Sequence, residues 1–228
     1  INYASRADSA KAVAAQCERH GAETLLCKAN VGEDADCRRM ADEAMKRWNR
    51  IDGLVNSAGT TKFADHGDME ALSGDDFLTV YRINVVGPWQ MVRAVLGPMR
   101  ATGAGAIVNI SSVAALRGTG SSVAYAASKA ALNAMTLSMA RNLGPEIRVN
   151  VVCPAMVTGR WHLEHLGQEK YDAQFNNWAN GTPLKQRVDP EDVADAVVWL
   201  LDGARKVTGQ TLVVDSGSVL GAAPPRRK

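Results

Sequence analysis

Apolar positions along the chain fall into two kinds of segment. One kind repeats every three to four residues, the period of an amphipathic helix, and predicts helices over residues 8–20, 34–49, 75–102, 123–143 and 189–201. The other kind is short and apolar throughout, as in strands covered on both faces, and predicts strands at ETLLCK (23–28), IDGLV (51–55), AGAIVNI (104–110), IRVNVV (147–152) and QTLVVD (210–215). Repeated strand–helix units predict an α/β fold with a doubly wound, Rossmann-type parallel sheet.

The pattern breaks in one long stretch, residues 156–187, which is rich in Trp, His, Asn and Gly. A stretch of this length without a regular period is typical of a lid or substrate loop, and we expect no regular elements in it. No composition shift or linker divides the chain, so residues 1–228 are predicted to form one domain. We expect residues 221–228 to be a flexible tail.

The composition of the chain argues against several classes of function: nucleic-acid binding, metal binding and membrane spanning. The 228 residues are 46% hydrophobic with a net charge of +2, which suits one globular core and no nucleic-acid partner. The four cysteines have no metal-ligand spacing and favour free thiols in a reducing compartment, hence a cytoplasmic protein. The four histidines form no convincing metal set, and no apolar run reaches the ~20 residues of a membrane span.

The sharpest chemical motif is Tyr125-Ala-Ala-Ser-Lys129. Residues four apart on a helix share one face, so the ammonium of Lys129 is expected near the Tyr125 phenol. A nearby ammonium favours phenolate and lowers a pKa that is ordinarily about 10. The pair is therefore a candidate acid/base group for work near neutral pH.

Two further residues surround this motif in the sequence. Ser112 ends the predicted strand AGAIVNISS and would point into the crevice where parallel sheets bind ligands, although Ser111 and Ser112 also suit an ordinary turn. Asn84 lies within a predicted helix, where Asn is a poor former. It is either a surface or capping residue, or a buried one whose backbone or side chain orders a water next to Lys129.

Small residues follow two of the predicted strands. The turn NSAG, residues 56–59, follows IDGLV and would let the backbone approach a flat ligand such as a nucleotide. The segment CPAMVT, residues 153–158, follows another strand and opens the irregular stretch.

Together these motifs resemble the classical short-chain dehydrogenase/reductase family, over essentially the whole chain. The family's catalytic Asn, Ser, Tyr and Lys correspond to Asn84, Ser112, Tyr125 and Lys129. Four departures are mild: Ser57 replaces an Asn, Ala155 and Ser216 replace glycines, and Asn30-Val31 replaces an Asp-Val pair. The resemblance implies cofactor contacts from Ser5, Arg6, Asn30, Val31, Asn56, Ser57, Ala58, Gly59, Tyr125, Lys129, Pro154, Val157 and Thr158.

The opening INYASRAD resembles the end of the family's second strand. We therefore expect an N-terminally truncated member that lacks the first strand–helix unit, most of the second strand and the family's Gly-rich turn. Because the family's first strand lies at the centre of the sheet, we expect an empty slot beside residues 51–55, or ETLLCK displaced into it.

The resemblance implies an oxidoreductase that interconverts a carbonyl and a secondary alcohol, with a 3-oxoacyl-thioester reductase as one subclass. Ser5-Arg6 with no acid at the strand end favours NADP(H), with NAD(H) possible, because Arg accommodates a 2′-phosphate; Arg6 can also be a solvated helix-start residue. The partners implied are a small carbonyl or alcohol substrate and a second copy of the chain, in a dimer or tetramer. The alternative is an inactive scaffold that acts only through oligomer contacts.

Overall fold

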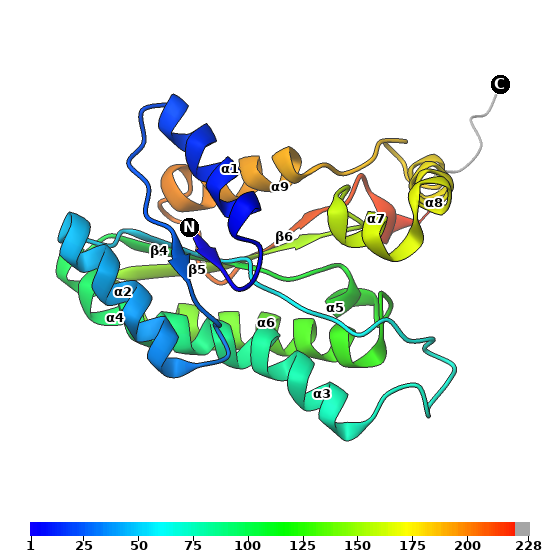
Figure 1. Ribbon diagram of the computed structural model, residues 1–228, viewed down its shortest axis with the longest axis horizontal. Helices are drawn as coiled ribbons and strands as arrows, with labels where there is room; N and C mark the ends of the chain where they lie inside the picture. Colours follow the sequence, from blue (N-terminus) through cyan, green and yellow to red (C-terminus); the bar gives the residue numbers. More distant parts are fainter. Residues whose placement is uncertain (222–228) are drawn as a thin grey trace.

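A computed structural model describes residues 1–221 as two small parallel sheets with helices on both faces (Figure 1). The strands are β1 (Asn2–Tyr3), β2 (Cys27–Lys28), β3 (Gly53–Asn56), β4 (Gly105–Ile110), β5 (Ile147–Pro154) and β6 (Thr211–Val214). The helices are α1 (Ala7–Arg19), α2 (Asp34–Trp48), α3 (Gly74–Tyr81), α4 (Gly87–Thr102), α5 (Ala114–Arg117), α6 (Val123–Asn142), α7 (Arg160–Leu166), α8 (Gln168–Asn180) and α9 (Pro190–Val198). Two π-helical segments, η1 (Arg82–Val86) and η2 (Trp199–Gly203), and the 3-10 turn η3 (Ser218–Leu220) complete the described chain.

The larger sheet has the strand order β3-β4-β5-β6, and every pairing is parallel. Its centre is β4 and β5, which pair over six residues from Gly105 opposite Ile147 to Ile110 opposite Val152. Most side chains of these two strands are buried, as expected where helices cover both faces. The predicted parallel α/β architecture is therefore confirmed.

The smaller sheet is the parallel pair β1 and β2, which does not join the larger one. A cavity of about 550 Å3 separates them, and it is lined on one side by Ile1 and Asn2 and on the other by residues 53–58. Val55 is 41% exposed although it lies in a strand. This cavity lies where the slot beside residues 51–55 is expected, and β1 is the strand on its other side. The segment ETLLCK is not displaced into it, because its Cys27 and Lys28 pair with β1 as β2, and residues 23–26 lie outside any strand.

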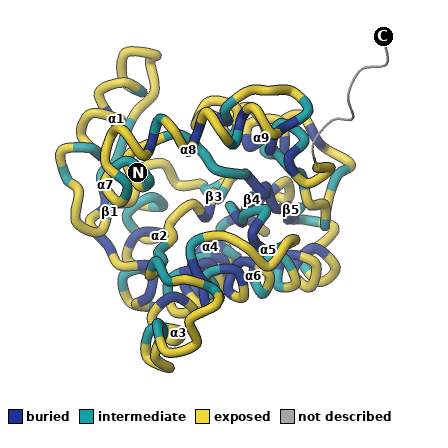
Figure 2. The backbone as a smooth tube through the Cα atoms, turned by 90° about the vertical axis from the view of Figure 1, so that its right-hand side faces the viewer, coloured by how far each residue is buried: buried dark blue, intermediate teal, exposed yellow. Residues whose placement is uncertain are grey.

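Helices α2, α4 and α6 cover one face of the sheets, and α1 and α9 lie over the other (Figure 1). One core cluster packs Met99 of α4 and Met139 of α6 against Ile107 and Val149 of the sheet. The tube in Figure 2 shows burial concentrated in β4, β5 and the inner side of α4 and α6, whereas α1 and α3 are mostly exposed. Within residues 1–221 no helix combines the length and apolarity that crossing a membrane requires.

Two expectations from the pattern need correction. The stretch 156–187 is not irregular, because it contains α7 and α8, whose buried Tyr171 and Phe175 anchor α8 to the domain. The predicted helix 75–102 is not uniformly α-helical, because η1 interrupts it around Asn84. Of the tail predicted at 221–228, residues 222–228 lie outside the described residues.

Candidate active site

Helix α6 carries Tyr125 and Lys129 in its first two turns. The hydroxyl of Ser122, which precedes the helix, accepts a hydrogen bond from the Tyr125 backbone N–H at 3.2 Å and so caps the helix. Tyr125 is therefore held close to the helix start. Lys129 lies one turn further along the same face, and its Nζ donates to the Ile110 carbonyl at the end of β4 at 2.8 Å.

Ser111 and Ser112 follow β4 and have different partners. The buried Ser111 hydroxyl donates to the Lys129 carbonyl at 3.1 Å, which ties the strand end to α6. Ser112 Oγ accepts from the Ala114 backbone N–H at 3.1 Å, and its hydroxyl lies near enough to the Tyr125 hydroxyl to affect the pKa of the phenol. Ser112 and Tyr125 thus meet at the same wall of one cavity, as their spacing in the sequence predicts.

Burial dominates the electrostatics of this pair. It raises the pKa of Tyr125 above its ordinary value, and the nearby Ser112 hydroxyl offsets part of that rise. Burial also lowers the pKa of Lys129 to about 8. The net shift is opposite to the lowered Tyr125 pKa expected from the sequence, because burial dominates it. The Lys129 ammonium is directed to the Ile110 carbonyl and lies 5.7 Å from the centre of the Tyr125 ring.

Asn84 is completely buried in η1, at the back of the site. Its Oδ1 accepts from the Thr60 backbone N–H at 2.8 Å, and its Nδ2 donates to the Thr60 carbonyl and the Ser128 hydroxyl, each at 2.9 Å. The Asn84 side chain is therefore fully occupied in holding the loop after β3 against α6. The surface and capping alternatives for Asn84 are excluded by this burial.

The cavity in front of Tyr125 has a volume of about 1160 Å3. Its walls come from the turn after β3, the end of β4, the start of α6, the segment after β5, and α7 and α8. Helix α7 roofs it: Trp161 meets the Tyr125 ring edge-on with centroids 6.2 Å apart, and His165 stacks on Phe63 at 3.7 Å. No sequence motif predicts a role for these aromatic residues; the only signal is that residues 156–187 are rich in Trp and His.

Several predicted cofactor residues line this cavity: Ser57, Gly59, Tyr125, Lys129, Pro154, Val157 and Thr158. Gly59 lies beside the reacting groups, since a Cβ there would lie 3.6 Å from Lys129 Nζ and 3.5 Å from Asn84 Oδ1. The Thr158 hydroxyl donates to the Asp189 carboxylate, and its backbone N–H donates to Val188. Its side chain is thus already engaged.

The other predicted cofactor residues lie elsewhere. Asn56 is buried and donates to Asn109 at 2.9 Å, so its side chain stabilises the sheet, and Ala58 faces the cavity between the sheets. Ser5 and Arg6 precede α1 and are exposed. The Arg6 guanidinium lies 2.6 Å from the Glu164 carboxylate of α7.

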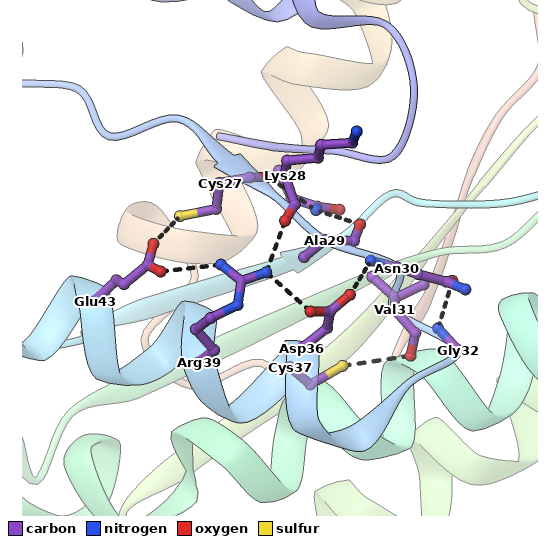
Figure 3. Close-up of polar contacts among 11 residues, drawn as sticks. Cys27, Lys28, Ala29, Asn30, Val31, Gly32, Asp36, Cys37, Arg39 and Glu43 are labelled. Carbon is purple, nitrogen blue, oxygen red and sulfur yellow. Dashed lines mark hydrogen bonds and ion pairs between the residues drawn. The ribbon is translucent and has the colours of Figure 1, made fainter.

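Asn30 and Val31 form the turn between β2 and α2 shown in Figure 3. The Asn30 Oδ1 accepts from the Gly32 N–H at 3.0 Å, and its own N–H donates to Asp36 at 2.8 Å (Figure 3). That backbone N–H and Arg39 lower the pKa of Asp36. Asn30 is exposed, whereas the Val31 side chain next to it is buried. A ligand at this turn could therefore reach the Asn30 side chain.

A nicotinamide coenzyme fits the donor set around Tyr125. Gly59 has no side chain to fill the space in front of Lys129, so a flat ring or sugar can lie there, and the Lys129 ammonium can donate to sugar hydroxyls. Among residues 1–221 no three His, Cys, Asp or Glu side chains are grouped so as to hold a metal ion.

Comparisons with known proteins match almost the whole chain. Residues 1–218 match the family model described as enoyl-(acyl carrier protein) reductase. The chain is 36% identical over 198 residues to ketoacyl reductase 2 of the granaticin polyketide synthase from Streptomyces violaceoruber, covering 87% of this chain and 78% of that protein. It is 31% identical over 223 residues to a 3-oxoacyl-(acyl-carrier-protein) reductase of Synechocystis sp., covering 96% and 86%. A solved structure from Burkholderia xenovorans, described as a short-chain dehydrogenase/reductase, superposes with a TM-score of 0.89 at 40% identity, covering 97% and 86%.

Proposed function

The chain belongs to the short-chain dehydrogenase/reductase family of oxidoreductases, and on that premise we propose that it reduces the ketone of a 3-oxoacyl thioester with NADPH. One observation carries the proposal: Ser112, Tyr125 and Lys129 converge on a single cavity that α7 roofs. The names of the Streptomyces and Synechocystis relatives support the substrate class.

Tyr125 is the proton donor in this proposal. A nicotinamide coenzyme held in the cavity would supply the hydride for the carbonyl carbon. The Tyr125 phenol gives its proton to the carbonyl oxygen. Burial raises the Tyr125 pKa, so the phenol keeps its proton at neutral pH until the oxygen gains negative charge. The Ser112 hydroxyl donates a hydrogen bond to the same oxygen and so fixes the carbonyl against Tyr125.

Lys129 binds the sugar of the coenzyme and balances charge. Its ammonium stands beside Gly59, where a ribose hydroxyl can accept from it. Once Tyr125 has lost its proton, the positive charge 5.7 Å from the ring centre stabilises the phenolate.

Asn84 is a positioning residue that holds the loop after β3 against α6. Its side chain is used up by Thr60 and Ser128, so any water-linked proton relay must begin at its backbone. The π-helical turn at η1 supports this role, because such turns shift backbone carbonyls out of the regular helical pattern.

Coenzyme choice rests on Ser5 and Arg6. The Arg6 guanidinium offers a planar set of donors suited to a phosphate, and we assign it to the 2′-phosphate of NADPH, with NADH as the alternative. Ser57, Pro154 and Val157 line the cavity and are assigned to the nicotinamide half. Thr158 is assigned to the same half through its backbone carbonyl, because its hydroxyl and N–H already donate to Asp189 and Val188. Asn30 and Val31 are assigned to the adenine, and Asn56 supports the fold beneath.

We further propose that the enzyme works as a homo-oligomer, a dimer or tetramer, in the cytoplasm. Large apolar side chains stand exposed along α3, α4 and α6, among them Leu78 at 69%, Trp89 at 47% and Leu137 at 54% exposure. A second copy of the chain would cover them. An inactive scaffold would use the same apolar surface for oligomer contacts. That alternative does not explain why Ser112, Tyr125 and Lys129 line one cavity.

The test is a coenzyme-oxidation assay of the purified chain with an acetoacetyl thioester. We expect turnover with NADPH that falls at least about a hundredfold in Ser112→Ala, because the carbonyl loses its hydrogen-bond donor. Ser138→Ala, on the outer side of α6, is the control and should be unchanged. Equal rates for Ser112→Ala and the unmodified enzyme would refute the assignment.

A further inference from the structure

The Glu164 carboxylate lies between two arginines from separate parts of the chain. Arg6, in the turn before α1, approaches Glu164 Oε2 at 2.6 Å, and Arg160, one helical turn earlier on α7, approaches Oε1 at 4.0 Å. Arg6 and Glu164 are 158 residues apart in sequence. The contact therefore depends on how the tertiary structure brings α7 to the start of α1.

A second contact joins the same two elements. Arg160 Nη1 donates to the Ser9 hydroxyl at 3.3 Å, and Arg160 also lines the cavity in front of Tyr125. The start of α1 thus holds the first turn of α7 at the edge of the active-site cavity through Arg6 and Ser9.

Helix α7 is placed to transmit a change at Glu164 to the reaction centre. Its Trp161 packs edge-on against Tyr125, so α7 covers the proton donor. Gly159 and Gly167 bound the helix at both ends with φ of 146° and 75°, a backbone region that few other residues adopt. Glycines at both ends allow α7 to tilt as one piece.

We propose that Glu164 is an internal competitor for Arg6 that makes the position of α7 depend on the coenzyme. In the protein without a 2′-phosphate, Glu164 pairs with Arg6 and holds α7 down. A coenzyme with a 2′-phosphate takes Arg6 from Glu164 and loosens α7 over Tyr125. The inference rests on the proposed assignment of Arg6 to the 2′-phosphate.

Charge decides this competition. A phosphate monoester carries nearly two negative charges and three acceptor oxygens near neutral pH, against one charge on a carboxylate. Arg binds such a group in a bidentate manner. The Arg6–Glu164 pair is half exposed on both sides and therefore weak, so a phosphate can displace it. Arg160 remains as a cation for the released Glu164.

The test uses two nucleotides that differ only in the group at issue, adenosine 2′,5′-bisphosphate and 5′-AMP. Their affinities are measured by calorimetry on the full chain and on Glu164→Gln. We expect Glu164→Gln to bind the bisphosphate about two- to fivefold more tightly and 5′-AMP equally well, because an exposed competing ion pair has been removed. Glu169→Gln, an exposed acid on the neighbouring α8, is the matched control and should change neither affinity.

Two further measurements separate the possible outcomes. The bisphosphate, but not 5′-AMP, should speed amide hydrogen exchange in residues 160–166, and Arg6→Ala should abolish the gain from Glu164→Gln. Equal affinity of the unmodified chain for both nucleotides, or binding of neither, would overturn the coenzyme assignment and the inference with it. A preference for the bisphosphate that Glu164→Gln does not strengthen would overturn the competition alone.

Discussion

The Lys129 ammonium donates a hydrogen bond of 2.8 Å to the Ile110 carbonyl, which fixes a buried cation at the end of β4. Only 4% of Lys129 is exposed, so this single bond substitutes for much of its hydration. The cost of burying the charge appears as the lowered pKa of about 8, against an ordinary value of 10.5.

A pH-dependent stability follows from that shift. Between pH 8 and 10.5 the unfolded chain keeps a proton on Lys129 that the folded chain releases, so stability rises with pH through this window. Relative to Lys129→Met, the free energy of unfolding of the unmodified protein should increase by about 3 kcal/mol from pH 7.5 to 10.5. Urea unfolding at several pH values measures this difference.

Lys46→Met, on the exposed side of α2, is the control for that series. Its difference from the unmodified protein should stay constant with pH. A constant difference for Lys129→Met as well would mean that Lys129 titrates normally in the folded protein.

Tyr125→Phe should reduce turnover by about a hundredfold or more, because only the phenol transfers the proton. Nucleotide binding should change little, since the ring and its contact with Trp161 remain. Steady-state rates and calorimetric affinities test both halves. Tyr81→Phe changes a partly exposed tyrosine on α3 and should keep full activity. A Tyr125→Phe rate within tenfold of the unmodified rate would show that Tyr125 is not the proton donor.

Asn84→Ala should destabilise the fold by about 2–4 kcal/mol, because the partly buried N–H and C=O of Thr60 lose their partner. Asn142→Ala removes a surface amide that donates to Ser138 on α6 and should cost less than about 1 kcal/mol. Chemical denaturation compares the two. Similar small losses for both would show that the loop after β3 does not depend on Asn84.

Gly87→Ala tests the close packing under the Asn30–Val31 turn. A Cβ at residue 87 would lie 2.8 Å from Val31 Cγ2 and 3.2 Å from the Val31 carbonyl oxygen. We expect a loss of about 1–3 kcal/mol despite the better helix propensity of alanine. In the double variant with Val31→Ala the losses should be less than additive by at least about 0.5 kcal/mol; additive losses would contradict the clash.

Arg6→Asp should shift coenzyme preference from NADPH toward NADH, because the substitution replaces a phosphate donor set with an acid that can accept from a ribose hydroxyl. The ratio of kcat/KM values for the two coenzymes measures the shift. Arg19→Asp, at the other end of α1, should leave the ratio unchanged. Comparable kcat/KM with both coenzymes in the unmodified enzyme would contradict the assignment.

The amino-acid sequence determined the class of fold and was enough to propose the reacting side chains. Apolar runs such as AIVNI and VNVV fixed β4 and β5, because strands covered on both faces admit few polar residues. The four-residue spacing placed Tyr125 and Lys129 on one helix face, and a strand-end position aimed Ser112 at the same crevice. These are local rules, and they hold without knowledge of distant contacts.

Only the tertiary structure decided the helices of residues 156–187, the Tyr125 pKa and the Arg6–Glu164 pair, because each depends on residues far away in the sequence. The stretch 156–187 has a weak local pattern, and packing of Tyr171 and Phe175 into the domain stabilises its helices. The Tyr125 pKa follows from burial by elements far along the chain, which outweighs the local effect of Lys129. The pairing of Arg6 with Glu164 joins residues 158 positions apart, and no local pattern predicts such a contact because surface charges suit many partners equally well.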